Sequence, residues 1–568
     1  MAFWRERSAD AAAVEGLVGL GLSPLQARLL AVRGVSAATL EGFLHPSMAD
    51  LASPTDLPGV DEAAKAVLRA VGLGRKIVVF GDYDCDGICA AAILVNALAA
   101  IGASAVAFIP ERLSEGYGMS DAAVERMLRE HPDVGLVVTV DNGINSVEQV
   151  ERLRERGVDA VVTDHHLPGE EVPRCPVVNP KLSSPPHLEA LCGAGVALML
   201  AFALVRAAKE AGMYSGPKIG GPLFVLAGIA TVTDIMPITG QNRILVHEAL
   251  RLFRQCAPIG LRELLDRASR SASANLTSRD FGFLIGPRIN AAGRVASGME
   301  ALSLVLADDR ELARELARKV DVYNAERKSI EQGMTDAAAA QIVPGAPAQV
   351  VNIENGHQGV AGIVASRLLE RLGPENAVPV CVVVGGHGSA RAPEGYNVRD
   401  AFACASEALV AFGGHAAAGG FSVKEGALER FRELFSAECV RQASAIPAHA
   451  RAAIAVDAEV DCGDLTLDFA RWLQTLEPFG EGNPQPTFAM RGATIADARP
   501  LGQDGRHLQL TVRRAGMMRG VWWNHGDVVE EVRSASSDRY DIVFSVGVSS
   551  YGDPHPEFRV VSMSRTED

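Results

Sequence analysis

Between residues 76 and 163 the sequence alternates short apolar runs with longer helical patterns. KIVVF (76–80), AVAFIP (105–110), GLVVTV (135–140) and DAVVT (159–163) each fit a buried strand, and helical stretches lie between them. Apolar strands that alternate with helices predict a parallel sheet covered on both faces. This part of the chain is therefore expected to form an α/β domain.

Acidic sequence follows three of these strands directly. GDYDCDG follows Phe80, DNG follows Val140 and DHH follows Thr163, while a later helical region ends in VTDIMP. Ligands of open parallel sheets bind beyond the carboxyl ends of the strands. We therefore expect one crevice to hold most of a set of acidic and imidazole side chains, namely Asp82, Asp84, Asp86, Asp141, Asp164, His165, His166 and Asp234.

A cluster of this composition predicts a divalent metal site. Neighbouring carboxylates repel one another and raise each other's pKa unless cations are present. Oxygen ligands with one or two histidines suit manganese or magnesium better than zinc. Two such ions bridged by a carboxylate are the usual apparatus for phosphodiester hydrolysis. Because adjacent side chains at a strand end point in different directions, we assign His165 to metal and His166 to the scissile phosphate or leaving group.

The alternating aspartates of GDYDCDG also resemble a calcium loop. Such a loop needs a glutamate about six residues after its glycine. Here Ile88 begins an apolar helical stretch instead, which excludes this interpretation.

The length of 568 residues predicts three to four domains at roughly 150 residues each. A long helical pattern over 310–340 is closed by Pro344, Gly345 and Pro347, and a new α/β pattern follows it. We expect an N-terminal helical extension (1–70), a parallel-sheet catalytic domain (71–308), a connecting helix (309–345), a second, smaller α/β domain (346–450) and a β-rich C-terminal domain (451–568).

Charge and cysteine usage limit the class of protein. The net charge of −15 argues against a protein that coats nucleic acid through overall positive potential, although it allows a local basic groove. Nine cysteines without CxxC pairs fit neither a disulfide framework nor a zinc ribbon. The start of the sequence lacks a signal peptide, and no apolar run reaches the ~18 residues of a membrane span. We expect a cytoplasmic protein.

The motifs GDYDCDG, VDNG, TDHH and VTDIMP, in this order, resemble those of the DHH phosphoesterase superfamily. Further segments resemble the RecJ single-strand-specific exonucleases more narrowly: FLHPSMADL, LPGVDEA, FLIGPRINAAGR, NAERKSIE, GVAGIVASRL, FGGHAAAGG and LEPFGEGNPQP. The resemblance implies a mixed α/β architecture. It would comprise a parallel-sheet DHH domain, a long connecting helix, a DHH-associated domain and a C-terminal OB-fold.

The same resemblance implies a 5′-to-3′ exonuclease that depends on two Mn²⁺ or Mg²⁺ ions and releases mononucleotides from single-stranded DNA in recombination and repair. It also implies single-strand-binding protein and a repair helicase as partners. Two alternatives are a DHH phosphodiesterase of very short oligonucleotides or cyclic dinucleotides, and a non-catalytic scaffold. The first generally lacks the N-terminal extension and the OB-fold, and the second usually loses metal ligands that are present here.

The resemblance also implies roles for individual residues. Asp84 and Asp141 would hold the first ion, while Asp86, Asp141, His165 and Asp234 would hold the second, with Asp82 supporting the first site. Several superfamily members carry a metal-binding histidine where this chain has Phe80, so the first ion is expected to be held more weakly. The remaining candidates are Asn290 and His166 as catalytic groups and Arg288, Arg294, Ser389, Arg391 and His415 as substrate-binding groups.

The segments that carry Ser389, Arg391 and His415 are rich in glycine, which lets backbone amides approach phosphate closely. Arg391 can bind phosphate through two nitrogens. The sequence SARA (389–392) departs from the SGRS more usual in the family. Ser389 and Arg391 remain in register, and we retain both as phosphate contacts.

The β-rich end predicts a surface for a single strand. HLQLTV (507–512) alternates strictly, which places Leu508, Leu510 and Val512 on the core side. Residues 491–519 contain six arginines and two aspartates, and OB-folds bind single strands through basic grooves and stacked aromatics. Trp522 and Trp523 are adjacent, so at most one of them can face such a groove.

Overall fold

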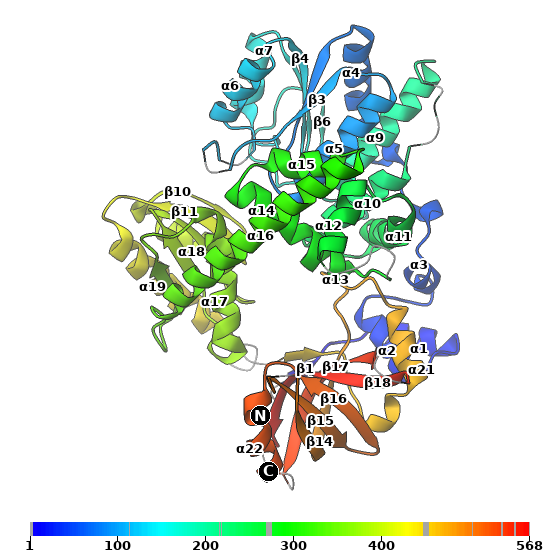
Figure 1. Ribbon diagram of the computed structural model, residues 1–568, viewed down its shortest axis with the longest axis vertical. Helices are drawn as coiled ribbons and strands as arrows, with labels where there is room; N and C mark the ends of the chain where they lie inside the picture. The colour runs from blue at the N-terminus through cyan, green and yellow to red at the C-terminus, as the bar shows by residue number, and fades with distance from the viewer. Residues whose placement is uncertain are drawn as a thin grey trace.

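Figure 1 shows the protein as a computed structural model. The structure describes residues 4–566 apart from 113, 117, 215, 217–218, 269–274, 447–453, 503, 536–537 and 550–552. Three bodies follow one another in space: an α/β domain at the top of the view, a second α/β domain at its left, and a β-barrel below. The expected mixed α/β architecture is confirmed.

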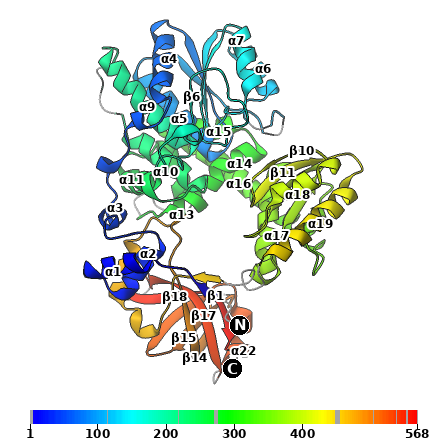
Figure 2. The ribbon, with the colours of Figure 1, turned by 180° about the vertical axis from the view of Figure 1, so that it is seen from behind.

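The first domain is built on a five-stranded parallel sheet with the order β3-β2-β4-β5-β6. On one face α4, α5 and α9 pack in the main apolar core, and on the other α6 and α7 enclose a smaller one (Figure 2). The four predicted strands and the helices between them are present, and the short edge strand β6 was not predicted. The bounds are β2 Lys76–Phe80, β3 Ala105–Phe108, β4 Val134–Val140, β5 Asp159–Thr163, β6 Val177–Val178, α4 Val60–Gly72, α5 Cys85–Ala100, α6 Asp121–Glu130, α7 Val147–Glu155 and α9 Gly193–Glu210.

A helical layer continues the domain beneath the sheet. Its central helix α10 is almost wholly buried between α5, α9 and α11, because its sequence GPLFVLAGIATVT is apolar on every side. It ends at Asp234, which brings that residue to the crevice. The layer comprises α10 Gly221–Thr233, α11 Gly240–Cys256, α12 Ile259–Arg267, α13 Ser278–Asp280, a π-helical turn Phe281–Ile285, α14 Gly286–Val295 and α15 Gly298–Leu306.

A single helix, α16 (Arg310–Ala339), joins the two α/β domains. Leu316 and Val320 in its first half belong to the core of the first domain. Met334 and Ala338 in its last turns belong to a core of the second domain. The helix therefore contributes apolar side chains to both domains that it connects.

The second domain has a five-stranded mixed sheet with the order β10-β11-β9-β8-β7. The end of α16 and α17 pack on one face, and α18 and α19 on the other. The bounds are β7 Gln349–Asn352, β8 Val380–Val384, β9 His387–Arg391, β10 Leu409–Gly414, β11 Ala418–Val423, α17 Ala361–Asn376, α18 Val398–Cys404 and α19 Leu428–Ala445.

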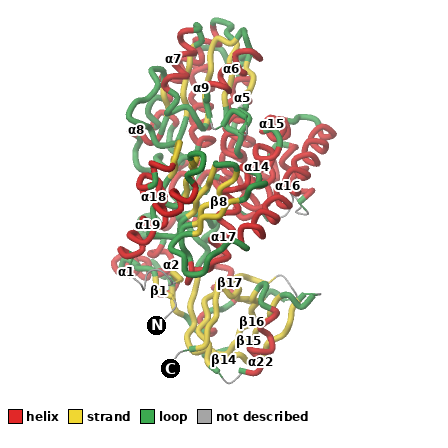
Figure 3. The backbone as a smooth tube through the Cα atoms, turned by 90° about the vertical axis from the view of Figure 1, so that its left-hand side faces the viewer, coloured by secondary structure: helices red, strands yellow, loops and turns green. Residues whose placement is uncertain are grey.

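The C-terminal strands close into a barrel, because β14 pairs with β17 in addition to the order β13-β14-β15-β16-β18-β17. Figure 3 shows these strands as one group apart from the other sheets. The predicted alternation is confirmed, since Leu508, Leu510 and Val512 are buried. The bounds are β13 Ala458–Glu459, β14 Thr487–Leu501, β15 His507–Arg513, β16 Met517–Trp522, β17 Arg539–Ser549, β18 His555–Arg565, α21 Leu467–Gln474 and α22 Val529–Ser534.

The N-terminal segment is divided between two bodies. Helix α4 packs in the first domain, whereas α1 (Ala11–Gly19) and α2 (Pro24–Val32) pack on the barrel. Arg28 of α2 donates to the carbonyl oxygen of Asp457, 429 residues away along the chain. The strand β1 (Trp4–Glu6) also pairs in parallel with β12 (Ile454–Val456) next to the barrel. The sequence indicated short helices here, but no local pattern shows which distant surface covers their apolar faces.

Two further expectations concern membranes and thiols. Along the described parts of the chain, none of the helices combines the length and the apolar character needed to cross a membrane. All nine cysteines are free thiols.

The shared core of α2 and the barrel leads to a prediction about stability. Leu29 is fully buried against the barrel, so Leu29→Ala should lower the free energy of unfolding of this unit by about 2–5 kcal/mol. Urea unfolding followed by tryptophan fluorescence measures the change. Leu20→Ala is the matched control, because Leu20 is 58% exposed. Equal stabilities of the two variants would contradict the shared core.

Candidate metal centre and substrate-binding residues

The crevice lies where the strand order of the first sheet reverses. Strand β2 has β3 on one side and β4 on the other, so the loops after β2 and β4 diverge and leave space between them. Asp82 and Asp84 lie in the first loop, and Asp141 follows β4. The three carboxylates come within 4.8 Å of one another. Sheet topology thus brings together residues that are far apart in the sequence.

The start of α5 fixes two carboxylates. Asp84 is the N-cap residue, and its Oδ1 accepts hydrogen bonds from the amides of Asp86 and Gly87 at 2.9 and 3.0 Å. Asp86 accepts two bonds of 2.7 Å from the amides of Gly193 and Ala194 at the start of α9. Backbone amides therefore orient both carboxylates before any cation binds.

Asp141 has a left-handed backbone conformation and packs against a glycine. Its φ is 63°, in the left-handed region that aspartate tolerates better than most residues. Gly193 lies against it, and a Cβ atom there would come within 2.5 Å of the Asp141 Cβ. The absence of a side chain at Gly193 therefore leaves the room that Asp141 occupies.

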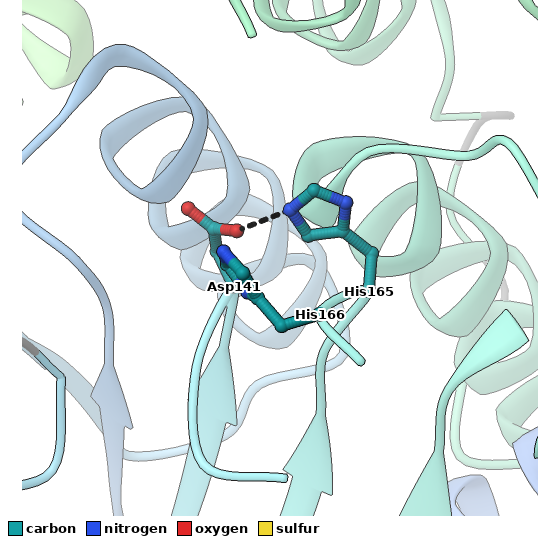
Figure 4. A group of neighbouring side chains, drawn as sticks. All are labelled: Asp141, His165 and His166. Atoms are coloured by element: carbon teal, nitrogen blue, oxygen red, sulfur yellow. Dashed lines mark ion pairs between the residues drawn. The ribbon is translucent and has the colours of Figure 1, made fainter. Parts of the chain in front are cut away.

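Figure 4 shows the two histidines and Asp141 at neighbouring strand ends. His165 Nε2 lies 3.1 Å from Asp141 Oδ1 and 3.7 Å from carboxylate oxygens of Asp86 and Asp234. His166 instead places its Nδ1 2.7 Å from Asp164 Oδ1. His165 thus lies among the carboxylates and His166 is hydrogen-bonded to Asp164, but ligand atoms of Asp141, His165 and His166 also lie within 4.8 Å of one another. The assignment of His165 to metal and His166 to the phosphate stays a prediction.

Asp164 is an organiser of this loop rather than a member of the carboxylate cluster. Its oxygens accept hydrogen bonds from the amides of Ile144, His165 and His166. Burial alone would raise the pKa of Asp164, but the hydrogen bond with His166 and that residue's charge lower it overall. Asp164 therefore stays ionised and holds both histidines in place.

Four carboxyl groups of the crevice have raised pKa values. Burial, and next the charge of a neighbouring aspartate, raises the pKa of Asp82, Asp84 and Asp141. The same causes raise the pKa of Asp234 to about 9. Groups in this state favour protons or metal cations as counter-charges.

The donor set fits divalent cations of the manganese and magnesium type. Asp82, Asp84 and Asp141 form one group, and Asp86, His165 and Asp234 form a second. A third group, Asp141 with His165 and His166, overlaps both of them. The buried Asp82 Oδ1 has no hydrogen-bond partner among the described residues, which leaves it available to a cation. Five carboxylates and one imidazole match hard ions better than zinc.

Phe80, which stands where several superfamily members carry a metal-binding histidine, lies in an apolar core. Its ring is fully buried and packs 5.0 Å from the ring of Phe108, in the core that α6 and α7 cover. An imidazole at this position would be buried in an apolar core. The expectation that the first ion is held more weakly because Phe80 replaces a histidine stays a prediction.

Three candidates lie on α14. Asn290 Oδ1 accepts a 2.7 Å hydrogen bond from the amide of Cys85, so it holds the aspartate-bearing loop by its backbone. Arg288 is paired with Asp321 at 2.9 Å. Arg294 is half-buried, and it donates to the carbonyl oxygen of Gly359 in the second domain at 2.7 Å. Of the three, Arg294 spans the two domains.

The second domain supplies the other candidates. Ser389 and Arg391 lie on β9, and a Cβ at Gly362 would come within 3.6 Å of the Ser389 hydroxyl and 3.1 Å of an Arg391 nitrogen. The missing side chain at Gly362 keeps both groups accessible at the start of α17. His415 is exposed in the turn between β10 and β11.

One residue near the crevice escaped the sequence analysis. Arg112 lies over the ring of Tyr83 at 5.0 Å, and its charge acts on both Asp82 and Arg294. It occurs in the loop after β3, in a stretch with ordinary composition. Only the tertiary structure indicates that this arginine belongs to the site.

Comparisons with known proteins agree with this geometry. Residues 76–220 match the model of the DHH family N-terminal domain, 345–441 that of the DHHA1 domain and 456–560 that of the RecJ OB domain. Single-stranded-DNA-specific exonucleases RecJ of Escherichia coli and Dickeya dadantii are 33% and 34% identical, and each match covers 89% of both chains. The chain belongs to the RecJ family.

A further RecJ, from Thermus thermophilus, is 37% identical over 83% of this chain, and the match covers 66% of that relative. The crystal structure of RecJ from Thermus thermophilus in complex with Mn²⁺ has a TM-score of 0.84, covering all of this chain and 80% of that one. The corresponding complex with Mg²⁺ has a TM-score of 0.78. The RecJ fold is therefore shared along the whole chain.

The carboxylate repulsion predicts strong stabilisation by cations. At a hundredfold excess over its Kd, Mn²⁺ should stabilise this RecJ-family protein by about 2.7 kcal/mol per site. Asp141→Asn should abolish most of that gain, while leaving the metal-free protein as stable as wild type or more so. Thermal unfolding with and without Mn²⁺ after chelation measures both effects. Asp133→Asn, in an exposed pair with Lys76, is the control and should keep the full gain.

Proposed function

We propose that this chain is a metal-dependent exonuclease that hydrolyses phosphodiester bonds of single-stranded DNA in the 5′-to-3′ direction and releases mononucleotides in recombination and repair. The observation that carries the proposal is the pair of adjoining ligand groups, in which Asp141 of one group lies 3.1 Å from His165 of the other. The names of the RecJ relatives as single-stranded-DNA-specific exonucleases support the choice of substrate. The polarity follows from the family resemblance.

We assign the cofactor as two Mn²⁺ or Mg²⁺ ions. Asp84 and Asp141 would hold the first, with Asp82 in support, and Asp86, Asp141, His165 and Asp234 would hold the second. When bound, such ions neutralise charge on the phosphate and activate water for attack. The Thermus thermophilus RecJ structures in complex with Mn²⁺ and with Mg²⁺ support this choice.

His166 would act on the reacting phosphate. Burial lowers its pKa, but the hydrogen bond with Asp164 and the surrounding carboxylates raise it overall. Because Nδ1 is engaged with Asp164, Nε2 is the nitrogen that can present a proton. A protonated Nε2 can donate to a phosphate oxygen or to the leaving oxygen. Asn290 would position the loop through Cys85 rather than touch substrate.

The substrate strand would lie between the two α/β domains. Arg294 and Arg112 flank the carboxylates from the first domain, while Ser389, Arg391 and His415 belong to the second. Guanidinium groups bind phosphate oxygens through paired hydrogen bonds. Arg288 is a weaker candidate, since its guanidinium is already paired with Asp321.

We further propose single-strand-binding protein and a repair helicase as partners, and the cytoplasm as the place of action. These assignments rest on the family resemblance and on a substrate that is DNA. Pull-down from a lysate with the wild-type chain, followed by mass spectrometry, tests the partners.

The central test uses a long single strand labelled at either end. With Mn²⁺, labelled mononucleotide should be released first from the 5′-labelled strand, and Asp141→Asn should lower turnover at least about 100-fold because both ligand groups are disturbed. Asp133→Asn should retain wild-type turnover. Release from the 3′ end first would refute the polarity, and a variant at position 141 with more than about a tenth of the wild-type rate would refute the shared-ligand assignment.

The barrel predicts a salt-dependent contribution to binding. Arg513 and Arg519 lie on the outer side of β15 and β16, and neither forms an ion pair among the described residues. Changing both to Gln should weaken binding of a long single strand and reduce the log–log salt slope by about 0.7 for each lost phosphate contact. Fluorescence anisotropy over a salt series measures this. Arg471→Gln, at an exposed arginine near Asp468, should leave the slope unchanged.

Trp523 offers the stacking counterpart of this surface. It is 49% exposed and lies edge-on to His507 at 4.7 Å, while Trp522 packs against the barrel core and stacks on His525. The expectation that at most one of the two faces outward is therefore met. Because α1 and α2 share the barrel core, point changes test the surface more cleanly than removal of residues 451–568.

A further inference from the structure

The loop LEPFGEGNPQP (476–486), here named the joint loop, connects α21 to β14 of the barrel. Three segments of the first domain reach it. Ile238 donates its amide to the Glu481 carbonyl at 2.7 Å, Ser278 donates its hydroxyl to the Phe479 carbonyl, and Arg243 of α11 contacts its beginning. The joint loop is thus where the barrel meets the domain that carries the metal ligands.

Arg243 makes the densest set of these contacts. Its guanidinium donates to the carbonyl oxygens of Glu477 at 2.8 Å, Pro478 at 3.4 Å and Phe43 at 2.8 Å. It also lies 3.9 Å from the centre of the Phe43 ring. One side chain therefore ties α11 to the joint loop and to the segment that leads from the barrel-bound helices back to the first domain.

The environment of Arg243 is unusual for a cation. The residue is 2% exposed, and no carboxylate lies within ion-pair distance of it in the described parts of the chain. Burial, and then the charge of Arg33, lowers its pKa to about 10. Burying a charge without a counter-charge is costly. The planar set of donors, matched to carbonyl oxygens of two segments, offsets that cost.

The far side of the joint loop is held by a second polar cluster. Asn483 donates to the carbonyls of Leu476 and Pro478, and Arg33 donates to the Asn483 side chain and to the Pro484 carbonyl. The joint loop is therefore fixed by hydrogen bonds on both sides. The apolar cores of the first domain and of the barrel are separate clusters, so these polar contacts carry much of the fixation between them.

The contact reaches close to a metal-ligand candidate. Ile238 is four residues after Asp234, and a Cβ atom at Gly480 would lie 2.4 Å from the Ile238 Cδ1. Asn242, adjacent to Arg243, donates to the Pro237 carbonyl of the same segment at 3.0 Å. The joint loop thus packs directly on the chain that leaves Asp234.

From these contacts we infer that Arg243 is a positioning residue, which sets the barrel against the metal centre so that a strand held on the barrel is delivered to the crevice. This inference rests on the proposed function, because it concerns long single strands. Arg243 itself touches neither the carboxylates nor the substrate-binding candidates. Its effect should therefore depend on whether a strand is long enough to engage both sites.

The test compares Arg243→Met, which removes the donors at similar volume, with Arg251→Met on the same helix. Arg251 is exposed and is paired with Glu248 in its own helix. Each protein is assayed on single strands of ~4 and ~40 nucleotides, since an OB-fold site spans about 4–16 nucleotides. Arg243→Met should raise KM for the long strand at least about fivefold, which is the change expected if one base no longer stacks on the barrel. The value of kcat on the short strand should stay within about twofold of wild type.

Loss of stability alone would lower turnover on both substrates together and would leave their KM ratio unchanged. If folded Arg243→Met has the same ratio of KM for the long strand to KM for the short strand as the wild type, the inference is overturned. Arg243→Lys keeps the charge without the planar donors, and it should behave like the Met variant. If Arg243→Met does not fold, Ser278→Ala is used instead, because it removes one hydroxyl that binds the joint loop. It should also raise KM for the long strand without changing kcat on the short strand, but by a smaller factor.

Small-angle scattering separates this inference from the proposed function. Arg243→Met should broaden the distance distribution of the metal-bound chain without DNA, whereas Arg251→Met should not. An unchanged distribution would overturn the positioning role even if the exonuclease activity is present. A wild-type protein that cleaves no single strand would refute the proposed function, while a broadened distribution would still support the joint.

Discussion

Repulsion among buried carboxylates is the constraint around which the catalytic domain is arranged. Asp82, Asp84 and Asp141 come within reach of one ion, and burial together with mutual charge raises their pKa values. The fold partly offsets this by aiming helix N-termini at the cluster, since α5 and α9 supply amides to Asp84 and Asp86. Cations supply the remaining counter-charge. The open position at Gly193 and the left-handed backbone of Asp141 follow from the need to crowd these groups together.

The proposed substrate-binding groups are held on two separate bodies. The arginines that we propose as phosphate contacts lie beside the carboxylate cluster and on the second α/β domain. Arg294 reaches the Gly359 carbonyl across the domain junction, and α16 contributes side chains to both α/β cores. Hydrogen bonds between domains fix the orientation of one domain relative to the other, because a hydrogen bond weakens steeply when it is misaligned.

The sequence predicted the elements of the sheet and the ligand set because both depend on local patterns. Strand β2 and the aspartates after it are neighbours in the chain, and parallel topology brings Asp141 beside them. The pairing of Arg288, the place of Arg112 and the burial of Phe80 depend instead on residues far away in sequence. Whether the first ion is held more weakly because Phe80 replaces a histidine stays a prediction.

The N-terminal helices also show that a local sequence pattern does not reveal which distant part of the chain an element packs against. Their apolar faces are evident locally, but Leu29 and Leu30 find their partners in the barrel at the other end of the chain. Arg33, directly after α2, then binds the joint loop from that side, while Arg243 binds it from the catalytic domain. The two ends of the chain therefore converge on one loop, which packs on the segment that follows Asp234. The joint loop and the segment that leads from α2 to α4 both contact α11, so a change in how the barrel is held can reach the first domain through either of them.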